Sequence, residues 1–473
     1  MKSRWTLVIL CLLTLIFSAQ VKQDKQPEAV PGEFIVKWKT DAVALAVDTL
    51  LRQAAEPTSR TPKMYGAVTR AVDTLLHRTS ATPLQTFPEI GLSLMQMPVT
   101  RDADEVRAQL KNDPRIEYIE PNYIYRASVV PNDPQYNELW GMNNTGQTGG
   151  TSDADLDAPE AWDTQTGSDS TLIAVIDTGV DYNHPDLAAN IWTNPGEIAG
   201  DGLDNDNNGY VDDVRGWDFA NNDKDPMDDN LHGTHVAGTI GAIGNNGIGV
   251  AGVNWRVKIM PLKFLAGNGS GTLANAISAI IYGANKKARV MNNSWGGGGF
   301  SQALQDAINY ANNAGSLFVA AAGNDGNDND TSPNYPSNYE VPNVVAVAAI
   351  DHKGDLAVFG SGGGGQCGCG GNVIGLPGSN FGATTVDLAA PGKDILSTTP
   401  GNGYQKLSGT SMATPHVAGV AGLLFAQFPT WTHLQVRTRL LSTVATAPGL
   451  QGKMVTGGRV NARRALSGTM AAD

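Results

Sequence analysis

Three short segments, far apart along the chain, carry residues that could together perform acyl transfer. Asp177 closes an apolar run in VIDTGVDYNHPDL, His232 opens a helical pattern in HGTHVAGTIGA, and Ser411 begins a long apolar helix in GTSMATPHVAGVAGLL. Acyl transfer needs a hydroxyl nucleophile, an imidazole that takes its proton and a carboxylate that orients the imidazole. These residue types therefore favour an enzyme that cleaves acyl compounds, for example at peptide bonds.

A fourth polar residue, Asn324 in AAAGNDG, follows another apolar run, and its amide could donate to a developing oxyanion. The order Asp, His, Asn, Ser, with an extended motif around each, resembles the subtilisin-like (subtilase) serine proteases over residues 130–465. The resemblance implies that Asp177, His232 and Ser411 form a catalytic triad. It also implies an oxyanion hole made by Asn324 and the backbone N–H of Ser411, at the positive end of a helix.

The same resemblance gives a role to the glycine-rich segment NNSWGGGG at 292–299. In the family this segment is an edge strand that pairs with the substrate backbone, so Ser294, Trp295 and Gly296 are expected to bind substrate by strand addition. Gly323 is expected to shape the pocket for the residue before the scissile bond. A buried strand with a glycine-rich exit is the alternative interpretation, although it does not explain the run of glycines.

An acidic segment predicts a calcium site, because ten Asp lie between residues 201 and 229. DNDNNGYVDD copies the first half of an EF-hand loop, in which oxygens at alternate positions converge on Ca²⁺. The twelfth position is Arg215 and not Glu, so the loop is no EF-hand. The predicted ligands are Asp204, Asp206 and Asn208, with Asp212 or Asp213 completing the shell. A solvated acidic loop is the alternative.

A second calcium site is implied by the resemblance alone. Asp133 in PNDP, Asp186 in HPDL and Asn246, Ile248 and Val250 in NNGIGV match positions that supply calcium ligands in the family. Such a site would tie the start of the mature enzyme to its core.

Two further histidines near the triad are interpreted as buried packing residues. His232 and His235 form an HxxH pair, but Gly233 stands where a zinc metalloprotease helix needs Glu. His416 follows Ser411 on the same apolar helix.

Five apolar runs predict strands that are buried on both faces. They are TLIAVID (171–177), VKIMPLKF (257–264), ARVMNNSW (288–295), SLFVAAAGN (316–324) and VVAVAAI (344–350). Helical patterns at 272–287, at 301–314 and from Ser411 onward alternate with them. Repeated strand–helix units predict an α/β fold with a doubly wound, mostly parallel sheet of the subtilisin type, whose site lies at the carboxyl ends of the strands.

The front of the chain has a different pattern. Strands are predicted from EFIVKWK at residue 33, from LSLMQMP at 92–98 and from IEYIEPNYIYR at 116–126, with a helix at 102–113. Such a small α+β unit resembles the ferredoxin-like propeptide of the family, which inhibits its own enzyme before self-cleavage. The cut is expected between Arg126 and Pro131. A permanent accessory domain is the alternative.

Residues 1–19 combine Lys2 and Arg4 with an apolar run, too short to span a bilayer, where about 20 apolar residues are needed. They predict a signal peptide and a secreted protein, or a periplasmic or cell-surface one if the segment is retained. The predicted division is a signal peptide at 1–19, a linker at 20–32, the propeptide at 33–127, the catalytic domain at 128–467 with a glycine-rich insert at 360–378, and a tail at 468–473.

Composition fits this interpretation. The chain has 473 residues, 41% hydrophobic and 17% charged, as in globular proteins. Its net charge of −13 argues against nucleic-acid binding. We expect a monomeric, calcium-stabilised serine endopeptidase acting on proteins or peptides, without a stable membrane span. A peptide ligase or cyclase on the same fold and a non-catalytic calcium-binding surface module are the alternatives.

Overall fold

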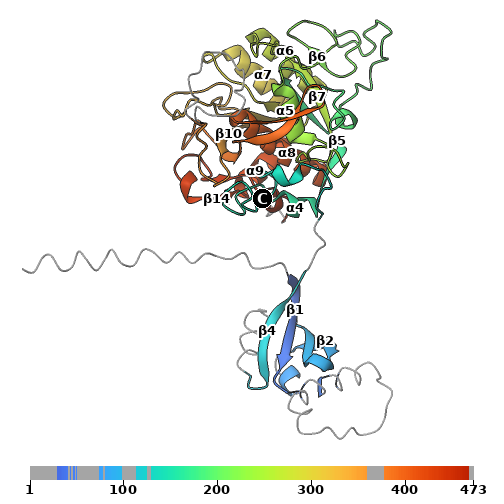
Figure 1. Cartoon of the computed structure of the whole chain (residues 1–473), viewed down its shortest axis with the longest axis vertical. Helices are drawn as coiled ribbons and strands as arrows, with labels where there is room; N and C mark the ends of the chain where they lie inside the picture. The colour runs from blue at the N-terminus through green and yellow to red at the C-terminus, as the bar shows by residue number, and fades with distance from the viewer. Residues whose placement is uncertain are drawn as a thin grey trace, which may run out of the picture. The chain divides into compact units, whose positions relative to one another are not determined.

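The computed structural model describes residues 29–40, 43, 46–47, 50, 74–77, 80–97, 113–124, 129–359 and 378–467. The chain divides into two compact units, residues 1–126 and 127–473 (Figure 1). The predicted signal peptide, the predicted helix at 102–113 apart from Asp113, the glycine-rich insert at 360–378 apart from Gly378, and the predicted tail lie outside the described residues.

The first unit contains a four-stranded antiparallel sheet in the order β2–β3–β1–β4. The strands are β1 (Ala29–Trp38), β2 (Thr82–Phe87), β3 (Leu92–Gln96) and β4 (Ile116–Tyr123), with the 3₁₀ turn η1 (Pro88–Ile90) between β2 and β3. Alternate side chains of β1, among them Phe34, Val36 and Trp38, enter one core. The three predicted strands are confirmed. β2 was missed because, as an edge strand that is largely exposed, it carries little apolar alternation.

The second unit is built on a nine-stranded sheet in the order β14–β15–β11–β10–β9–β8–β5–β7–β6, parallel except for the β14–β15 pair. The strands are β5 (Gly167–Asp177), β6 (Trp217–Asp218), β7 (Arg256–Lys263), β8 (Val290–Asn293), β9 (Leu317–Ala321), β10 (Val344–Ile350), β11 (Leu388–Pro391), β14 (Ala445–Thr446) and β15 (Gly458–Arg459). All five predicted buried strands are present, which confirms the mostly parallel α/β class.

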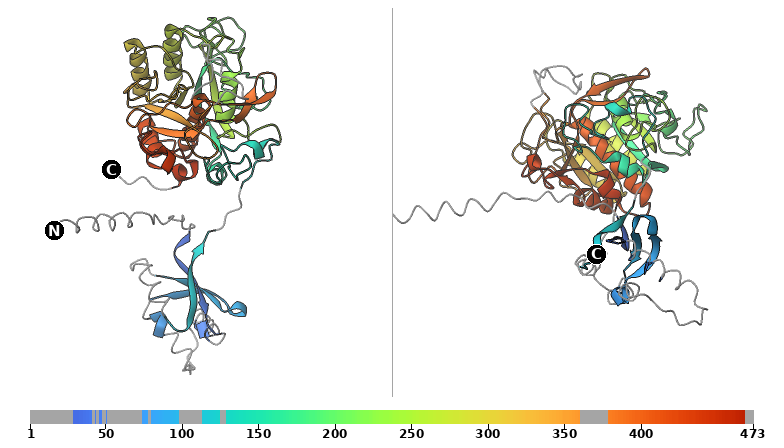
Figure 2. Two further views of the ribbon diagram at one scale, coloured as in Figure 1. Left: turned by 60° about the vertical axis from the view of Figure 1, so that its left-hand side comes forward. Right: turned by 60° about the horizontal axis from the view of Figure 1, so that its bottom comes forward.

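Helices cover both faces of this sheet (Figures 1 and 2). The helices are α4 (Ala158–Trp162), α5 (His232–Gly241), α6 (Leu273–Asn285), α7 (Gln302–Asn313), α8 (Thr410–Gln427), α9 (His433–Ser442) and α10 (Ala462–Leu466), with the turns η2 (Tyr136–Glu138), η3 (Ala188–Asn190) and η4 (Pro448–Leu450). Apolar residues of α5 and α8 pack on one face, and those of α6 and α7 pack on the other. A separate antiparallel hairpin, β12 (Ile395–Thr399) and β13 (Gly403–Leu407), lies beside α5.

Small residues let α5 and α8 approach their neighbours closely. A Cβ at Gly238 of α5 would lie 2.1 Å from Oγ1 of Thr398, and one at Gly419 of α8 would lie 2.6 Å from Cβ of Val253. Most of α8 is buried on every side. The carboxyl ends of β5, β8 and β9 therefore meet the first turns of these two helices at one edge of the sheet.

Candidate active site

Asp177 and His232 form a buried hydrogen-bonded pair. Asp177 ends β5 and His232 begins α5, and Oδ1 of the carboxylate lies 2.7 Å from Nδ1 of the imidazole. Both side chains are almost fully buried, at 0% and 1% exposed. The N–H of Thr178 donates to the same Oδ1 at 2.7 Å. A carboxylate so held favours the tautomer with the proton on Nδ1, which makes Nε2 the basic nitrogen.

Ser411 is the second residue of α8, and its hydroxyl is tied to Ser294. Oγ of Ser411 donates to the carbonyl of Ser294 at 3.0 Å, and Oγ of Ser294 donates to the carbonyl of Ser411 at 2.9 Å. Nδ2 of Asn292 in turn donates to Oγ of Ser294 at 2.9 Å. The end of β8 thus fixes the first turn of α8, and sequence reasoning did not anticipate this pairing.

The amide of Asn324 has one orientation fixed by its neighbours. Its Oδ1 accepts hydrogen bonds from the backbone N–H of Thr410 at 2.8 Å and from the Thr410 hydroxyl at 3.0 Å. Its Nδ2 is therefore presented as a donor. A Cβ built on Gly409 would lie 3.5 Å from this Nδ2 and 3.7 Å from the backbone nitrogen of Ser411. The Asn324 amide and the Ser411 N–H therefore both lie near Gly409, at the N-terminus of α8.

The predicted substrate segment continues β8 beyond the sheet. β8 itself pairs with both β5 and β9, so the buried-strand interpretation describes residues 290–293. Ser294 is also buried, and the chain first becomes accessible at Trp295 and Gly296. Trp295 and Gly296 line a cavity of about 530 Å³, and the Trp295 ring packs edge-to-face on Phe264 with ring centroids 4.9 Å apart.

Gly296 and Gly323 are brought together although they follow different strands. A Cβ on Gly296 would lie 3.1 Å from Nδ2 of Asn334, and one on Gly323 would lie 3.2 Å from Cγ of the same Asn334. A side chain at Gly296 would therefore crowd Asn334, and one at Gly323 would first meet Nδ2 of Asn380, which lies only 2.5 Å from the Cβ position. No sequence motif singled out Asn334, because its place depends on the loop after β9.

The residues of the second predicted calcium site also meet. Asn246 donates to both acids, from its N–H to Oδ1 of Asp133 at 3.3 Å and from Nδ2 to Oδ1 of Asp186 at 2.8 Å. The N–H of Val250 donates to Oδ2 of Asp186 at 3.0 Å, and the N–H of Ile248 donates to Oδ1 of Asn246 at 2.7 Å. Burial raises the pKa of Asp133 and of Asp186. A bound cation would offset the cost of burying these two carboxylates together.

The acidic segment gathers a different set from the one its spacing suggested. Glu197, Asp206 and Asp213 bring one carboxylate oxygen each to within 4.8 Å of one another. Oε2 of Glu197 and Oδ1 of Asp206 are buried without a hydrogen-bond partner in the described part of the chain. Lys286 pairs with Asp206 and, at 3.4 Å, with Asp213, so its ammonium contacts two of the three carboxylates. These oxygens fit Ca²⁺, which prefers carboxylate ligands.

The alternating residues that resemble an EF-hand loop instead form a turn that begins at Asp204. Both carboxylate oxygens of Asp204 accept backbone N–H groups, at 3.0 and 2.8 Å, from the turn that follows it. Asp212 is ion-paired with Lys224 at 2.7 Å. Asn208 reaches the cluster only by donating from Nδ2 to Asp213 at 2.7 Å. Glu197 was missed because it lies outside the alternating run.

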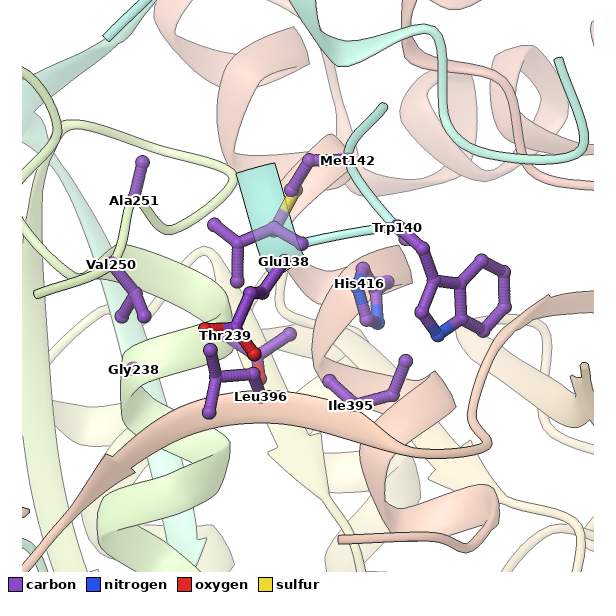
Figure 3. A pocket seen from close by; sticks show the side chains of 12 residues that line it. Glu138, Trp140, Met142, Gly238, Thr239, Val250, Ala251, Ile395, Leu396 and His416 are labelled. Atoms are coloured by element: carbon purple, nitrogen blue, oxygen red, sulfur yellow. The ribbon is translucent and has the colours of Figure 1, made fainter. Parts of the chain in front are cut away.

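The two additional histidines pack as expected. Nε2 of His235 lies 2.9 Å from the carbonyl of Ile395, and Nδ1 of His416 lies 2.8 Å from that of Met412. Figure 3 shows His416 beside Trp140 at a cavity of about 10 Å³, which has room for a single water molecule and no ligand.

Comparisons with known proteins show which family the chain is similar to. The family model described as "Subtilase family" matches residues 168–461, and the model described as "Fervidolysin N-terminal prodomain" matches residues 68–122. The chain is 39% identical over 367 residues to the thermophilic serine proteinase of Bacillus sp. (strain AK1), covering 77% of this chain and 76% of the relative. It is 40% identical over 311 residues to thermitase of Thermoactinomyces vulgaris, covering 66% of this chain and 93% of thermitase.

Two other similarities extend the comparison. An extracellular protease of Xanthomonas campestris pv. campestris is 34% identical over 462 residues, which is 92% of this chain and 72% of the relative. The solved structure of a Pseudoalteromonas arctica protease aligns with a TM-score of 0.56 and 30% identity, covering 72% of this chain and 99% of that one. In the described residues, no helix has the length and apolarity needed to cross a membrane. The chain therefore belongs to the subtilase family and is a subtilisin-like serine endopeptidase with an N-terminal prodomain of the fervidolysin type.

Proposed function

We propose that Ser411 is the nucleophile of this endopeptidase and that His232 is its general base and then its general acid. The observation that supports these roles best is the buried 2.7 Å contact between Asp177 and His232, which orients the imidazole. His232 takes the proton as Oγ of Ser411 leaves the Ser294 carbonyl and attacks the scissile carbonyl, and it returns the proton to the leaving amine. Water then cleaves the acyl-enzyme.

Charge on the tetrahedral intermediate is stabilised by Nδ2 of Asn324 and the backbone N–H of Ser411. Both donors border Gly409, and the Thr410 contacts hold the Asn324 amide in the donating orientation. The hole is thus ready before the charge develops.

Substrate is proposed to bind as an extended protein chain against Ser294, Trp295 and Gly296. The 530 Å³ cavity beside Trp295 is lined by Phe264 and Leu273 as well as glycines, so we expect it to favour an apolar substrate side chain. Gly323 and Gly296 are proposed to border the side chain next to the scissile bond, together with Asn380 and Asn334, which pack against them.

The prodomain is proposed to inhibit the enzyme until self-cleavage between Arg126 and Pro131, with limits of 33–127 for the prodomain and 128–467 for the catalytic domain. A signal peptide at 1–19 and secretion are proposed with it. The Xanthomonas relative is described as extracellular, which supports secretion.

Calcium is proposed at two places. Asp133, Asp186, Asn246, Ile248 and Val250 would hold one ion near the start of the catalytic unit. Asp206 and Asp213 would hold the other together with Glu197. A bound ion would supply positive charge that stabilises the folded loops, and it takes no part in the acyl transfer.

A serine-directed fluorophosphonate tests the proposed function. Full-length protein with calcium should become labelled on Ser411 and should release a mature chain that begins between residues 126 and 131. Ser411→Ala should abolish both, lowering turnover by on the order of 10⁶. Ser294→Ala keeps the nucleophile and should still be labelled. Product masses distinguish hydrolysis from ligation. Labelling and processing that survive in Ser411→Ala would refute the assignment.

A further inference from the structure

Lys263 is a buried charged residue to which the proposed chemistry gives no role. It is the last residue of β7 and is 1% exposed. In the sheet it stands in register with Asp177 of β5 on one side and with Asp218 of β6 on the other. An ammonium is strongly disfavoured in a protein interior unless its donors are satisfied, so its surroundings must explain its presence.

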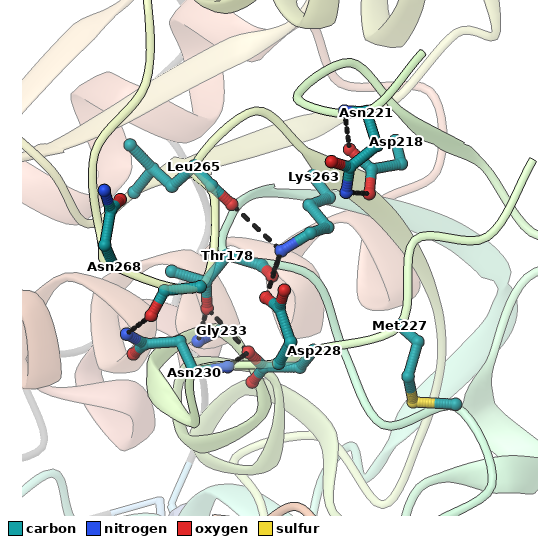
Figure 4. A network of polar contacts seen from close by, with 12 residues as sticks. Thr178, Asp218, Asn221, Met227, Asp228, Asn230, Gly233, Lys263, Leu265 and Asn268 are labelled. Atoms are coloured by element: carbon teal, nitrogen blue, oxygen red, sulfur yellow. Dashed lines mark hydrogen bonds and ion pairs between the residues drawn. The ribbon is translucent and has the colours of Figure 1, made fainter. Parts of the chain in front are cut away.

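The three donors of the ammonium have three acceptors (Figure 4). Nζ of Lys263 lies 2.6 Å from the carbonyl of Thr178, 3.0 Å from that of Leu265 and 2.5 Å from Oδ1 of Asp229. Thr178 directly follows Asp177, and Asp229 lies in the loop that leads to His232. One buried side chain therefore bridges the two segments that carry the imidazole and its carboxylate.

Thr178 extends this bridge to α5. Its hydroxyl donates to Oδ1 of Asp228 at 2.9 Å and accepts from the N–H of Gly233 at 2.9 Å (Figure 4). Oδ2 of Asp228 accepts from the N–H of Thr234 at 2.9 Å. The turn after Asp177 is thus bound to the first turn of α5 as well as to Lys263.

The residue before His232 needs such support. Leu231 has φ 144°, a conformation that side-chain-bearing residues rarely adopt. Its N–H donates to Oδ1 of Asp228 at 3.1 Å, and the N–H of His232 donates to Oδ1 of Asn230 at 3.2 Å. Strained backbone of this kind persists only where its surroundings determine it strongly.

We infer that Lys263 is a positioning residue for the Asp177–His232 pair. Its ammonium holds the Thr178 carbonyl against the Asp229 carboxylate, and so fixes the end of β5 relative to the loop that precedes α5. The inference rests on the proposed function, because it concerns the residues assigned there as base and orienting acid.

The charge of Lys263 supplies a readout that a purely structural role would not change. The acidic groups around it come from three places: Asp177 of β5, Asp218 of β6, and Asp228 and Asp229 of the loop before α5. On α5, the charge of His232 also acts on its neighbour, because it lowers the pKa of His235. Burial raises the pKa of Asp218, and the Lys263 ammonium opposes that rise. Removing the ammonium leaves excess negative charge next to Asp177, the carboxylate that bonds His232, and this raises the pKa of the imidazole.

Lys263→Met is tested through the pH dependence of kcat/KM on a peptide substrate, with matured protein in calcium. We expect kcat to fall about tenfold with KM nearly unchanged. We also expect the acidic limb of the kcat/KM profile to shift to higher pH by about half to one unit. Lys263→Arg, which keeps the charge, should leave the limb at its wild-type position. The matched control is Lys258→Met on the same strand, because Lys258 is 30% exposed and bonds the carbonyl of Ala189. It should leave the limb and kcat unchanged.

Asp229→Asn keeps the test decisive if Lys263→Met fails to fold. Asp229 is 56% exposed, and its loss removes a negative charge from the same group, so the limb should move to lower pH. A limb that stays in place in Asp229→Asn, or in a folded Lys263→Met with reduced activity, would overturn the inference. Wild-type protein that fluorophosphonate does not label would instead overturn the proposed function.

Discussion

At the scale of single residues, the site depends on how a few polar side chains are oriented. Asn324 could offer either its oxygen or its nitrogen to a substrate. Thr410 decides between them, because its N–H and its hydroxyl both donate to Oδ1 of Asn324. Nδ2 is then left as the donor, in an amide that lies near Gly409, as does the Ser411 nitrogen.

Replacing Asn324 by Ala should therefore lower kcat by about 10²–10³ and leave KM within about threefold, since the amide acts on charge present only in the transition state. Steady-state kinetics on a peptide substrate measure this. Asn327→Ala, at an exposed position three residues on, is the control and should behave as wild type. A loss that appears in KM alone would show that Asn324 binds the ground state instead.

At the scale of elements, loops with many carboxylates must be held by something other than apolar burial. The segment from Glu197 to Asp213 contains no helix or strand, and it folds through turns closed by Asp and Asn side chains. Of its three converging carboxylates, those of Asp206 and Asp213 pair with Lys286. Excess negative charge at one point destabilises the loop unless a cation is bound.

Calcium should therefore raise the melting temperature, and Glu197→Gln should lose part of that increase. A ligand at one hundred times its Kd adds about 2.7 kcal/mol per site, which is several degrees. Differential scanning calorimetry with calcium and with excess EDTA measures the effect. Asp201→Asn, in the same loop but outside the cluster, should keep the full increase. An equal increase in Glu197→Gln and wild type would place the ion elsewhere.

At the scale of the whole molecule, buried histidines link stability to pH. Burial lowers the pKa of His235 to about 3 and that of His416 to about 4. In the unfolded chain a histidine titrates near 6.5. Their contribution to stability is therefore fully present above pH 6.5 and is lost as the pH falls toward 4 and 3. Asp155, whose pKa burial raises to about 7, acts in the opposite direction, since its protonated form is favoured by the fold.

His416→Asn separates the two effects, because Asn can keep the donor to the Met412 carbonyl without titrating. Between pH 6.5 and 4, the melting temperature of wild type should fall more steeply than that of His416→Asn. The comparison uses thermal unfolding of the Ser411→Ala form, which does not digest itself. Parallel slopes would mean that His416 does not contribute to acid lability.

The sequence by itself determined the strands of the large sheet and the residues at their ends. Runs such as VVAVAAI are buried on both faces and need no partner to be recognised, and Asp177, His232, Asn324 and Ser411 lie in extended local motifs. The same local signal failed for the edge strand β2, which is mostly exposed.

Only the tertiary structure decided which polar atoms meet. The pairing of Ser411 with Ser294 and the bridge made by Lys263 join segments that are distant in sequence. The inclusion of Glu197 with Asp206 and Asp213 depends on how a loop without helix or strand folds back on itself. A hydrogen bond or ion pair depends on distances of a few tenths of an ångström between side chains. Those distances follow from strand register and helix packing, which no local pattern of residues records.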